Sequence, residues 1–200
     1  NYMQSIFKAR ANKATSKKWL LDTVDEVNSA VYRLGNTKDE YKGMGTTLVA
    51  AIVTEKSTFV ANVGDSRCYI LTDKNELVQI TEDHTLINFL VKNKGVSKEI
   101  ASRMVGKNVI SRAIGIGNIV EADTFEILND YKCLLLCSDG LHGYVNDEEI
   151  TELYKKIYYD SKKNNADTYV RTSEYSIAKC EQKGHDFTQN PCNPTDNRGC

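Results

Sequence analysis

Three aspartates stand where the chain is expected to turn, and each could bind a metal ion. Asp139 follows the apolar run 133–137, so it should lie at the rim of a sheet, where ligand groups can converge. Its carboxylate, with backbone carbonyls made accessible by Gly140, offers the oxygen ligands that Mg²⁺ and Mn²⁺ prefer. The alternative is a hydrogen bond within a turn, a common role of aspartate. The segment Ser138-Asp139-Gly140 alone favours the turn.

The other two aspartates carry weaker signals. Asp65 lies in Gly64-Asp65-Ser66, between two strand-like runs, and a hairpin turn would account for this segment fully. Asp186 follows the last expected helix and indicates nothing by itself. A zinc site near the end of the chain is not indicated, because four, six and seven residues separate Cys180, His185, Cys192 and Cys200, which matches no common zinc pattern.

The composition is that of one soluble globular domain. The chain has 200 residues, 40% hydrophobic and 26% charged, which is enough to bury a core. A net charge of -1 gives no support for a nucleic-acid or membrane-surface partner. The apolar runs are far shorter than the roughly 20 residues of a membrane span, and residues 1–10 lack the apolar core of a signal peptide. Three of the six cysteines fall in strand-like runs, so we expect a reducing, cytoplasmic setting.

The hydrophobic pattern predicts the elements that would position these aspartates. A helix is expected over 15–34, because five apolar residues recur on one helical face: Leu20, Val24, Val27, Val31 and Leu34. Runs rich in β-branched and aromatic residues then predict an antiparallel meander with strands over 46–53, 58–63, 67–72 and 76–80. The remaining elements are helices over 85–95 and 97–105, strands over 119–128 and 132–138, and helices over 146–160 and 167–183.

This order of elements indicates an α+β fold with an antiparallel sheet. Asn146 and Glu149 stand at the spacing of a capping box at the start of the helix over 146–160. The last residues, 187–200, contain both prolines and two cysteines but only one large apolar residue, so we expect a loop or disordered tail after a domain over 1–186.

Five short motifs, in this order, resemble those of the protein phosphatase 2C family, the metal-dependent Ser/Thr phosphatases, and the bacterial type most closely. They are GMGTT (43–47), VGDSR (63–67), TEDHT (81–85), ISRAIG (110–115) and SDGL (138–141). Five motifs in order are far more specific than any one of them, and the resemblance covers about residues 15–150.

The resemblance implies a fold and an activity. The family's fold is an antiparallel β-sandwich flanked by helices, in four α/β/β/α layers. Its activity is hydrolysis of phosphoserine and phosphothreonine in proteins by a metal-bridged water, with no catalytic side chain. By resemblance, two or three Mg²⁺ or Mn²⁺ ions would be held by Asp139, Gly140, Asp186 and Asp65. Residues 85–110 would form a flap that influences substrate choice, and His84 at its base is expected to be structural rather than catalytic. Phosphorylated proteins and a cognate Ser/Thr kinase would be its partners.

The sequence also departs from the family pattern. Nothing before Gly43 resembles the family's first strand with its phosphate-binding arginine, or its Asp-Gly-Met-Gly-Gly turn, so we expect a domain that is incomplete at the N-terminus. Gly143 stands where the family often has an acidic residue, and the chain diverges after Asp186. An alternative therefore stays open, in which the chain is a truncated or degenerate phosphatase-like domain without activity that acts at most as a protein-binding module.

Overall fold

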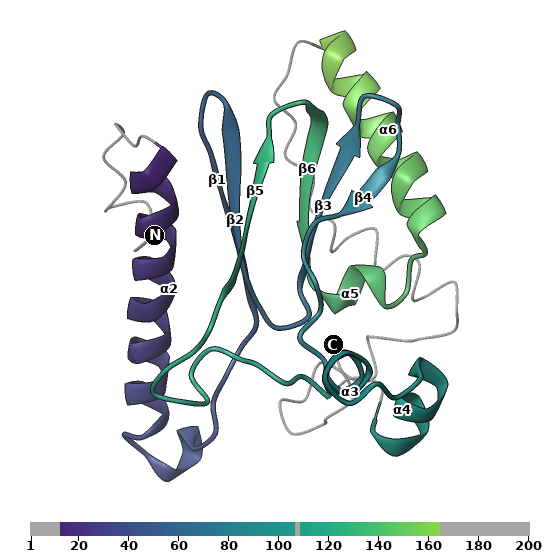
Figure 1. The fold of residues 1–200 in the computed structure, drawn as a ribbon. Coiled ribbons are helices and arrows are strands. Elements are labelled where there is room, and N and C mark those ends of the chain that lie inside the picture. The colour runs from purple at the N-terminus through teal and green to yellow at the C-terminus, as the bar shows by residue number, and fades with distance from the viewer. Residues whose placement is uncertain (1–12, 107–108, 165–200) are drawn as a thin grey trace. The chain divides into compact units, whose positions relative to one another are not determined.

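The computed structural model describes residues 13–106 and 109–164 (Figure 1). These residues form two compact units. Of the described residues, the first unit contains those up to Ser66 and those between Thr81 and Asn129, and the second contains Arg67–Ile80 and those from Asp130 onward. Each unit contains a three-stranded antiparallel sheet together with helices, so the predicted α+β class with antiparallel pairing is confirmed. None of the described helices is long and apolar enough to cross a membrane.

The sheet of the first unit is ordered β1-β2-β5, with strands Leu48–Val53, Ser57–Val63 and Asp123–Leu128. The central strand β2 is buried along its whole length. Helix α2 (Lys13–Gly35) packs Leu20 and Val24 into one core with side chains of β1 and β2. The helix predicted over 15–34 is therefore confirmed, although Leu34, in its last turn, is 49% exposed.

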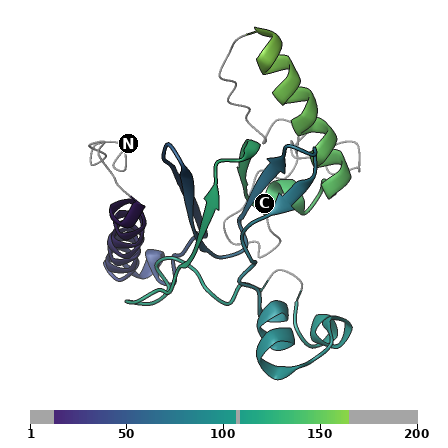
Figure 2. The ribbon, with the colours of Figure 1, turned by 45° about the horizontal axis from the view of Figure 1, so that its top comes forward.

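Two short helices follow in the same unit, and Figure 2 shows them as a hairpin. Helix α3 spans Leu86–Lys94 and helix α4 spans Lys98–Met104, as the sequence predicted. Thr85 caps α3 through its side-chain oxygen, which accepts the Asn88 N–H. Gly95 ends α3 with a φ of 63°, a left-handed conformation that glycine adopts without steric cost. The 3₁₀ helix η1 (Asp39–Tyr41) lies between α2 and β1 along the chain.

The sheet of the second unit is ordered β4-β3-β6, with strands Leu77–Gln79, Arg67–Thr72 and Tyr131–Cys137. Helix α5 (Asp139–His142) follows β6 directly, and α6 (Asp147–Asn164) follows α5. The predicted capping box is confirmed, because Asn146 Oδ1 accepts the Glu149 N–H at 2.8 Å and Glu149 Oε2 accepts the Asn146 N–H at 3.4 Å. Tyr69, Leu135, Ile150 and other apolar residues of these elements form one core.

The predicted meander is wrong. β2 pairs with β1 and β5, whereas β3 pairs with β4 and β6, so β2 and β3 belong to different sheets. The segment Gly64-Asp65-Ser66 is therefore a connection between two sheets and not a hairpin turn. A hairpin and such a connection carry the same local glycine and aspartate signal, and only the pairing with the distant strands β5 and β6 separates them. The predicted helix over 167–183 and the tail over 187–200 lie outside the described residues.

Candidate functional site

Asp139 is positioned by the junction between β6 and α5 in the second unit. β6 ends at Cys137, and α5 begins at Asp139. Leu141 and Val145, 2% and 1% exposed, anchor the chain that follows in the core. The Asp139 carbonyl accepts the Gly143 N–H at 2.8 Å, but among the described residues the Asp139 carboxylate has no hydrogen-bond or ion-pair partner. The turn hydrogen bond considered as the alternative is thus not found in this part of the chain.

Gly140 and Gly143, the two glycines after Asp139, differ in whether their surroundings leave room for a side chain. At Gly143, an added Cβ would lie 2.7 Å from the Asp139 carbonyl oxygen, so a side chain there would disturb α5. At Gly140, φ is not positive, and an added Cβ would lie 3.4 Å from the Ser138 Oγ, close to ordinary contact. Packing among the described residues therefore explains Gly143 but not Gly140.

Asp65 lies in the first unit, between two residues that are held in place. Gly64 has a φ of 108° and is buried, and an added Cβ would lie 2.4 Å from the Thr47 Cγ2. Its carbonyl accepts the His84 N–H at 2.9 Å and the Asn62 side-chain amide at 3.2 Å. On the other side, the Ser66 hydroxyl lies 2.8 Å from the Thr47 hydroxyl. The backbone of half-buried Asp65 is thus fixed at both ends.

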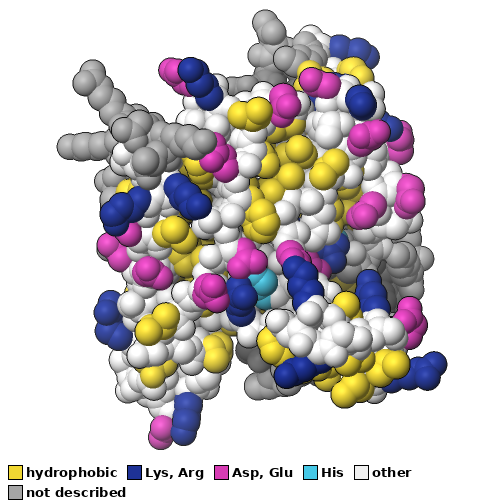
Figure 3. Space-filling model, in the orientation of Figure 1, with side chains coloured by type: hydrophobic (Ala, Val, Ile, Leu, Met, Phe, Trp, Pro, Cys, Tyr) yellow, Lys and Arg dark blue, Asp and Glu magenta, His cyan; other side chains and the backbone are white. Residues whose placement is uncertain are grey.

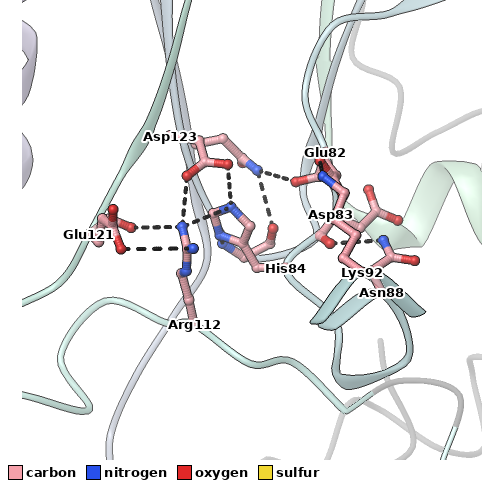
Figure 4. A network of polar contacts seen from close by, with 10 residues as sticks. Glu82, Asp83, His84, Asn88, Lys92, Arg112, Glu121 and Asp123 are labelled. Atoms are coloured by element: carbon pink, nitrogen blue, oxygen red, sulfur yellow. Dashed lines mark hydrogen bonds and ion pairs between the residues drawn. The ribbon is translucent and has the colours of Figure 1, made fainter. Parts of the chain in front are cut away.

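His84 is the centre of a polar network in the first unit, shown in Figure 4. Its Nδ1 accepts the buried Gly64 N–H at 3.1 Å, and its Nε2 lies 3.2 Å from the Asp123 Oδ2. Because Nδ1 is an acceptor, the ring proton is on Nε2, which donates to Asp123. The ring is 6% exposed and both of its nitrogens are engaged, so it has no nitrogen left for proton transfer to a substrate. These contacts support the structural role predicted for His84.

Asp123 and Arg112 complete this network. Arg112 Nη1 donates to the Asp123 Oδ1 at 2.7 Å, and Arg112 Nη2 lies 3.9 Å from the Glu121 Oε2. Partial burial disfavours the charged form of Asp123, but the hydrogen bonds from His84 and Arg112 and the positive charge of Arg112 outweigh this effect and lower the pKa of Asp123. Sequence reasoning missed this role of both residues. Arg112 stands in the motif over 110–115, but Asp123 has no local signal and is brought to His84 only by the pairing of β5 with β2.

The described residues supply only part of a metal site. Carboxylate oxygens suit a hard divalent cation, but such an ion takes six or more oxygen ligands. No group of three or more His, Cys, Asp or Glu side chains that could hold a metal occurs within 13–106 and 109–164. Asp65 and Asp139 belong to different units and are each described in their own surroundings, and Asp186 lies outside the described residues. Carboxylate oxygens fit the Mg²⁺ or Mn²⁺ ions that the sequence predicted, but the described residues supply too few of them to hold an ion.

The chain is similar to known phosphatases. Residues 4–182 match the family described as Protein phosphatase 2C. Serine/threonine phosphatase stp of Listeria monocytogenes is 41% identical over 153 residues, which cover 76% of this chain and 60% of the relative. Protein phosphatase PhpP of Streptococcus pneumoniae is 31% identical over 140 residues, or 68% of this chain and 55% of the relative. The chain thus spans about 60% of the length of these curated relatives or less.

Solved structures of bacterial serine/threonine phosphatases are also similar to this chain. Serine/threonine phosphatase Stp1 from Staphylococcus aureus is similar with a TM-score of 0.68 and 32% identity, covering 88% of this chain and 64% of that chain. The catalytic domain of serine threonine protein phosphatase PstP, solved in complex with 2 manganese ions, is similar with a TM-score of 0.61 and 27% identity, covering 90% of this chain and 68% of that chain.

Proposed function

Since the chain belongs to the protein phosphatase 2C family, we propose that the protein hydrolyses phosphoserine and phosphothreonine in other proteins with the help of divalent metal ions. The observation that carries this proposal is the carboxylate of Asp139. It stands at the end of an anchored strand and has no partner within the described residues, although an aspartate in a turn commonly makes a local hydrogen bond. A carboxylate held in this way is ready to bind a cation.

We assign the metal ligands to Asp139 with the Gly140 backbone, to Asp65 and to Asp186, together holding two or three Mg²⁺ or Mn²⁺ ions. When bound, such ions activate a water molecule and stabilise the negative charge of the phosphoryl group. The remaining ligands would come from beyond the described residues.

The surface of the α3–α4 hairpin supports a protein as the substrate. Phe89, Ile100 and Met104 are 45%, 53% and 62% exposed, and hydrophobic side chains gather over this hairpin in Figure 3. Phosphorylated proteins in the cytoplasm, and a kinase that phosphorylates them, are the partners that fit this assignment. The domain over 1–186 with a separate tail over 187–200 remains part of the proposal.

A degenerate domain without activity is the second candidate, and the comparisons do not favour it. The relatives that it resembles are named as phosphatases, and the segment from Ser138 to Leu141 keeps an ordered helix start in this chain. The two candidates differ in one measurable property, which is turnover in the presence of a divalent metal.

The test measures hydrolysis of p-nitrophenyl phosphate and of a phosphothreonine peptide by the purified protein with Mn²⁺ and with EDTA. We expect turnover that needs Mn²⁺ and that falls at least about 100-fold in Asp139→Asn, more than is usual for loss of a group that only orients a ligand. Asp147→Asn is the matched control, because Asp147 is an exposed acid at the start of α6, and it should keep wild-type turnover. A folded wild-type protein without turnover, or an Asp139→Asn variant as active as the wild type, would refute the proposal.

A further inference from the structure

We propose that His84, oriented by Asp123 and Arg112, is a positioning residue that fixes the Gly64-Asp65 peptide and thereby aims the Asp65 carboxylate. This inference rests on the proposed role of Asp65 as a metal ligand. It concerns residues of the first unit only. Neither the motif that contains His84 nor the connection that contains Asp65 indicates by itself that one holds the other.

The contact between His84 and Gly64 has two points. The His84 N–H donates to the Gly64 carbonyl at 2.9 Å, and the Gly64 N–H donates to the His84 Nδ1 at 3.1 Å. Backbone and side chain of one residue thus hold both polar groups of the other. The Gly64 carbonyl belongs to the Gly64-Asp65 peptide and the Gly64 N–H to the Val63-Gly64 peptide, so the two hydrogen bonds hold the backbone on both sides of Gly64, directly before Asp65.

The His84 ring is held from its other side. Asp123 Oδ2 accepts from the His84 Nε2 at 3.2 Å, and Asp123 Oδ1 accepts from Arg112 at 2.7 Å. Arg112 Nη1 also lies 3.4 Å from the His84 Nε2, but both atoms are donors in this tautomer, so this approach reflects the shared carboxylate and is not a hydrogen bond. Asp123 therefore selects the tautomer in which Nδ1 is free to accept from Gly64.

The loop that carries His84 is fixed as well. The His84 carbonyl accepts the Ser111 N–H at 2.7 Å, and the Asn62 side-chain amide donates to both the Gly64 carbonyl and the Glu82 carbonyl, at 3.2 and 3.0 Å. Asn62 is fully buried in β2. The geometry of the Gly64-Asp65 peptide is thus tied to β2 and, through Asp123, to β5, the rigid elements of this unit.

Two substitutions at His84 test the roles of its two ring nitrogens separately. In His84→Asn, the side-chain oxygen can take the place of Nδ1 and accept from Gly64, but the donor to Asp123 is lost. In His84→Gln, the side-chain amide can take the place of Nε2 and donate to Asp123, but the acceptor for Gly64 is lost. Asn88→Ala is the control, because it removes a 2.9 Å hydrogen bond to the Asp83 carbonyl in the same loop without touching Gly64.

The experiment follows hydrogen exchange of the Gly64 amide by NMR and the Mn²⁺ concentration for half-maximal hydrolysis of p-nitrophenyl phosphate. In His84→Gln we expect Gly64 exchange at least about fivefold faster, the equivalent of one neutral hydrogen bond, and a half-maximal Mn²⁺ concentration raised about 10- to 100-fold. His84→Asn should keep Gly64 exchange within about twofold of the wild type and change the Mn²⁺ requirement less. Asn88→Ala should change neither quantity.

Asp65→Asn separates the failure of this inference from the failure of the proposed function. If Asp65→Asn raises the Mn²⁺ requirement but His84→Gln does not, His84 does not position Asp65. If Asp65→Asn leaves the requirement unchanged, Asp65 is not a metal ligand and both proposals about it are wrong. Should His84→Gln fail to fold, Asp123→Ala decides, since Asp123 is 35% exposed and its loss frees the ring without removing it. An unchanged Mn²⁺ requirement in Asp123→Ala then overturns the inference.

Discussion

Replacement of Gly64 by alanine should destabilise the protein by about 2–6 kcal/mol, and the structure separates this free energy into two parts. Gly64 has a φ of 108°, and an L-residue held in such a conformation costs about 1–3 kcal/mol. The added Cβ would also lie 2.7 Å from the Thr47 Cβ and 3.2 Å from the Thr47 Cα, so the crowding cannot be relieved by rotating the threonine side chain. Crowding of this kind costs about 1–3 kcal/mol more.

Gly43→Ala isolates the first part. Gly43 also has a positive φ, of 78°, but nothing lies within 4 Å of a Cβ added there. Its strain of about 1–2 kcal/mol is partly offset by the smaller entropy of the unfolded chain, so we expect a loss below about 1.5 kcal/mol. Urea unfolding followed by circular dichroism measures both variants. With a slope of about 2 kcal/mol per molar, a loss of about 4 kcal/mol lowers the midpoint by about 2 M. Equal midpoints for Gly64→Ala and Gly43→Ala would refute the crowding argument.

Three further predictions concern other parts of the molecule. Leu141→Ala should lower the free energy of unfolding by about 2–5 kcal/mol, because Leu141 is 2% exposed in the core that anchors α5. Urea titrations measure this loss, and a loss below about 1 kcal/mol would contradict the prediction. Folding lowers the pKa of Asp123 from 3.8, so the stabilising effect of its carboxylate is present above that pH and is lost as the pH falls through the lower folded value. In Asp123→Asn, the free energy of unfolding should therefore fall less steeply than in the wild type below about pH 4. An unchanged slope would contradict this prediction. Burial raises the pKa of Cys68 to about 12, so iodoacetamide at pH 8 should leave Cys68 unmodified in the native protein and should label it in urea. Peptide mass spectrometry measures the labelling. Labelling of Cys68 in the native protein would disprove its burial.

The sequence was sufficient for features that depend on neighbouring residues. The apolar face of α2 with Leu20 and Val24 and the capping box of α6 depend on residues within a few positions of one another, and the structure shows them as predicted. The order of five motifs predicted the family, which the comparisons confirm over residues 4–182.

The sequence was not sufficient for features that depend on distant residues. Glycine and aspartate at 64 and 65 signal a turn, but the pairing of β2 with β5 and of β3 with β6 decides that the chain changes sheets there. His84 was recognised as structural, but its partners could not be found, because Gly64 and Asp123 lie 20 and 39 residues away along the chain. Asp123 pairs with Asn62 in the sheet, and no local pattern reports such a contact.

Binding of Mn²⁺ measured by isothermal titration calorimetry tests most directly whether Asp139 holds a divalent cation. The purified wild-type protein, Asp139→Asn and the control Asp147→Asn would be compared at pH 7.5. We predict that Asp139→Asn weakens or abolishes the tightest Mn²⁺ binding, while Asp147→Asn binds Mn²⁺ as the wild type does. Equal Mn²⁺ binding by Asp139→Asn and the wild type would contradict the assignment of Asp139 as a metal ligand.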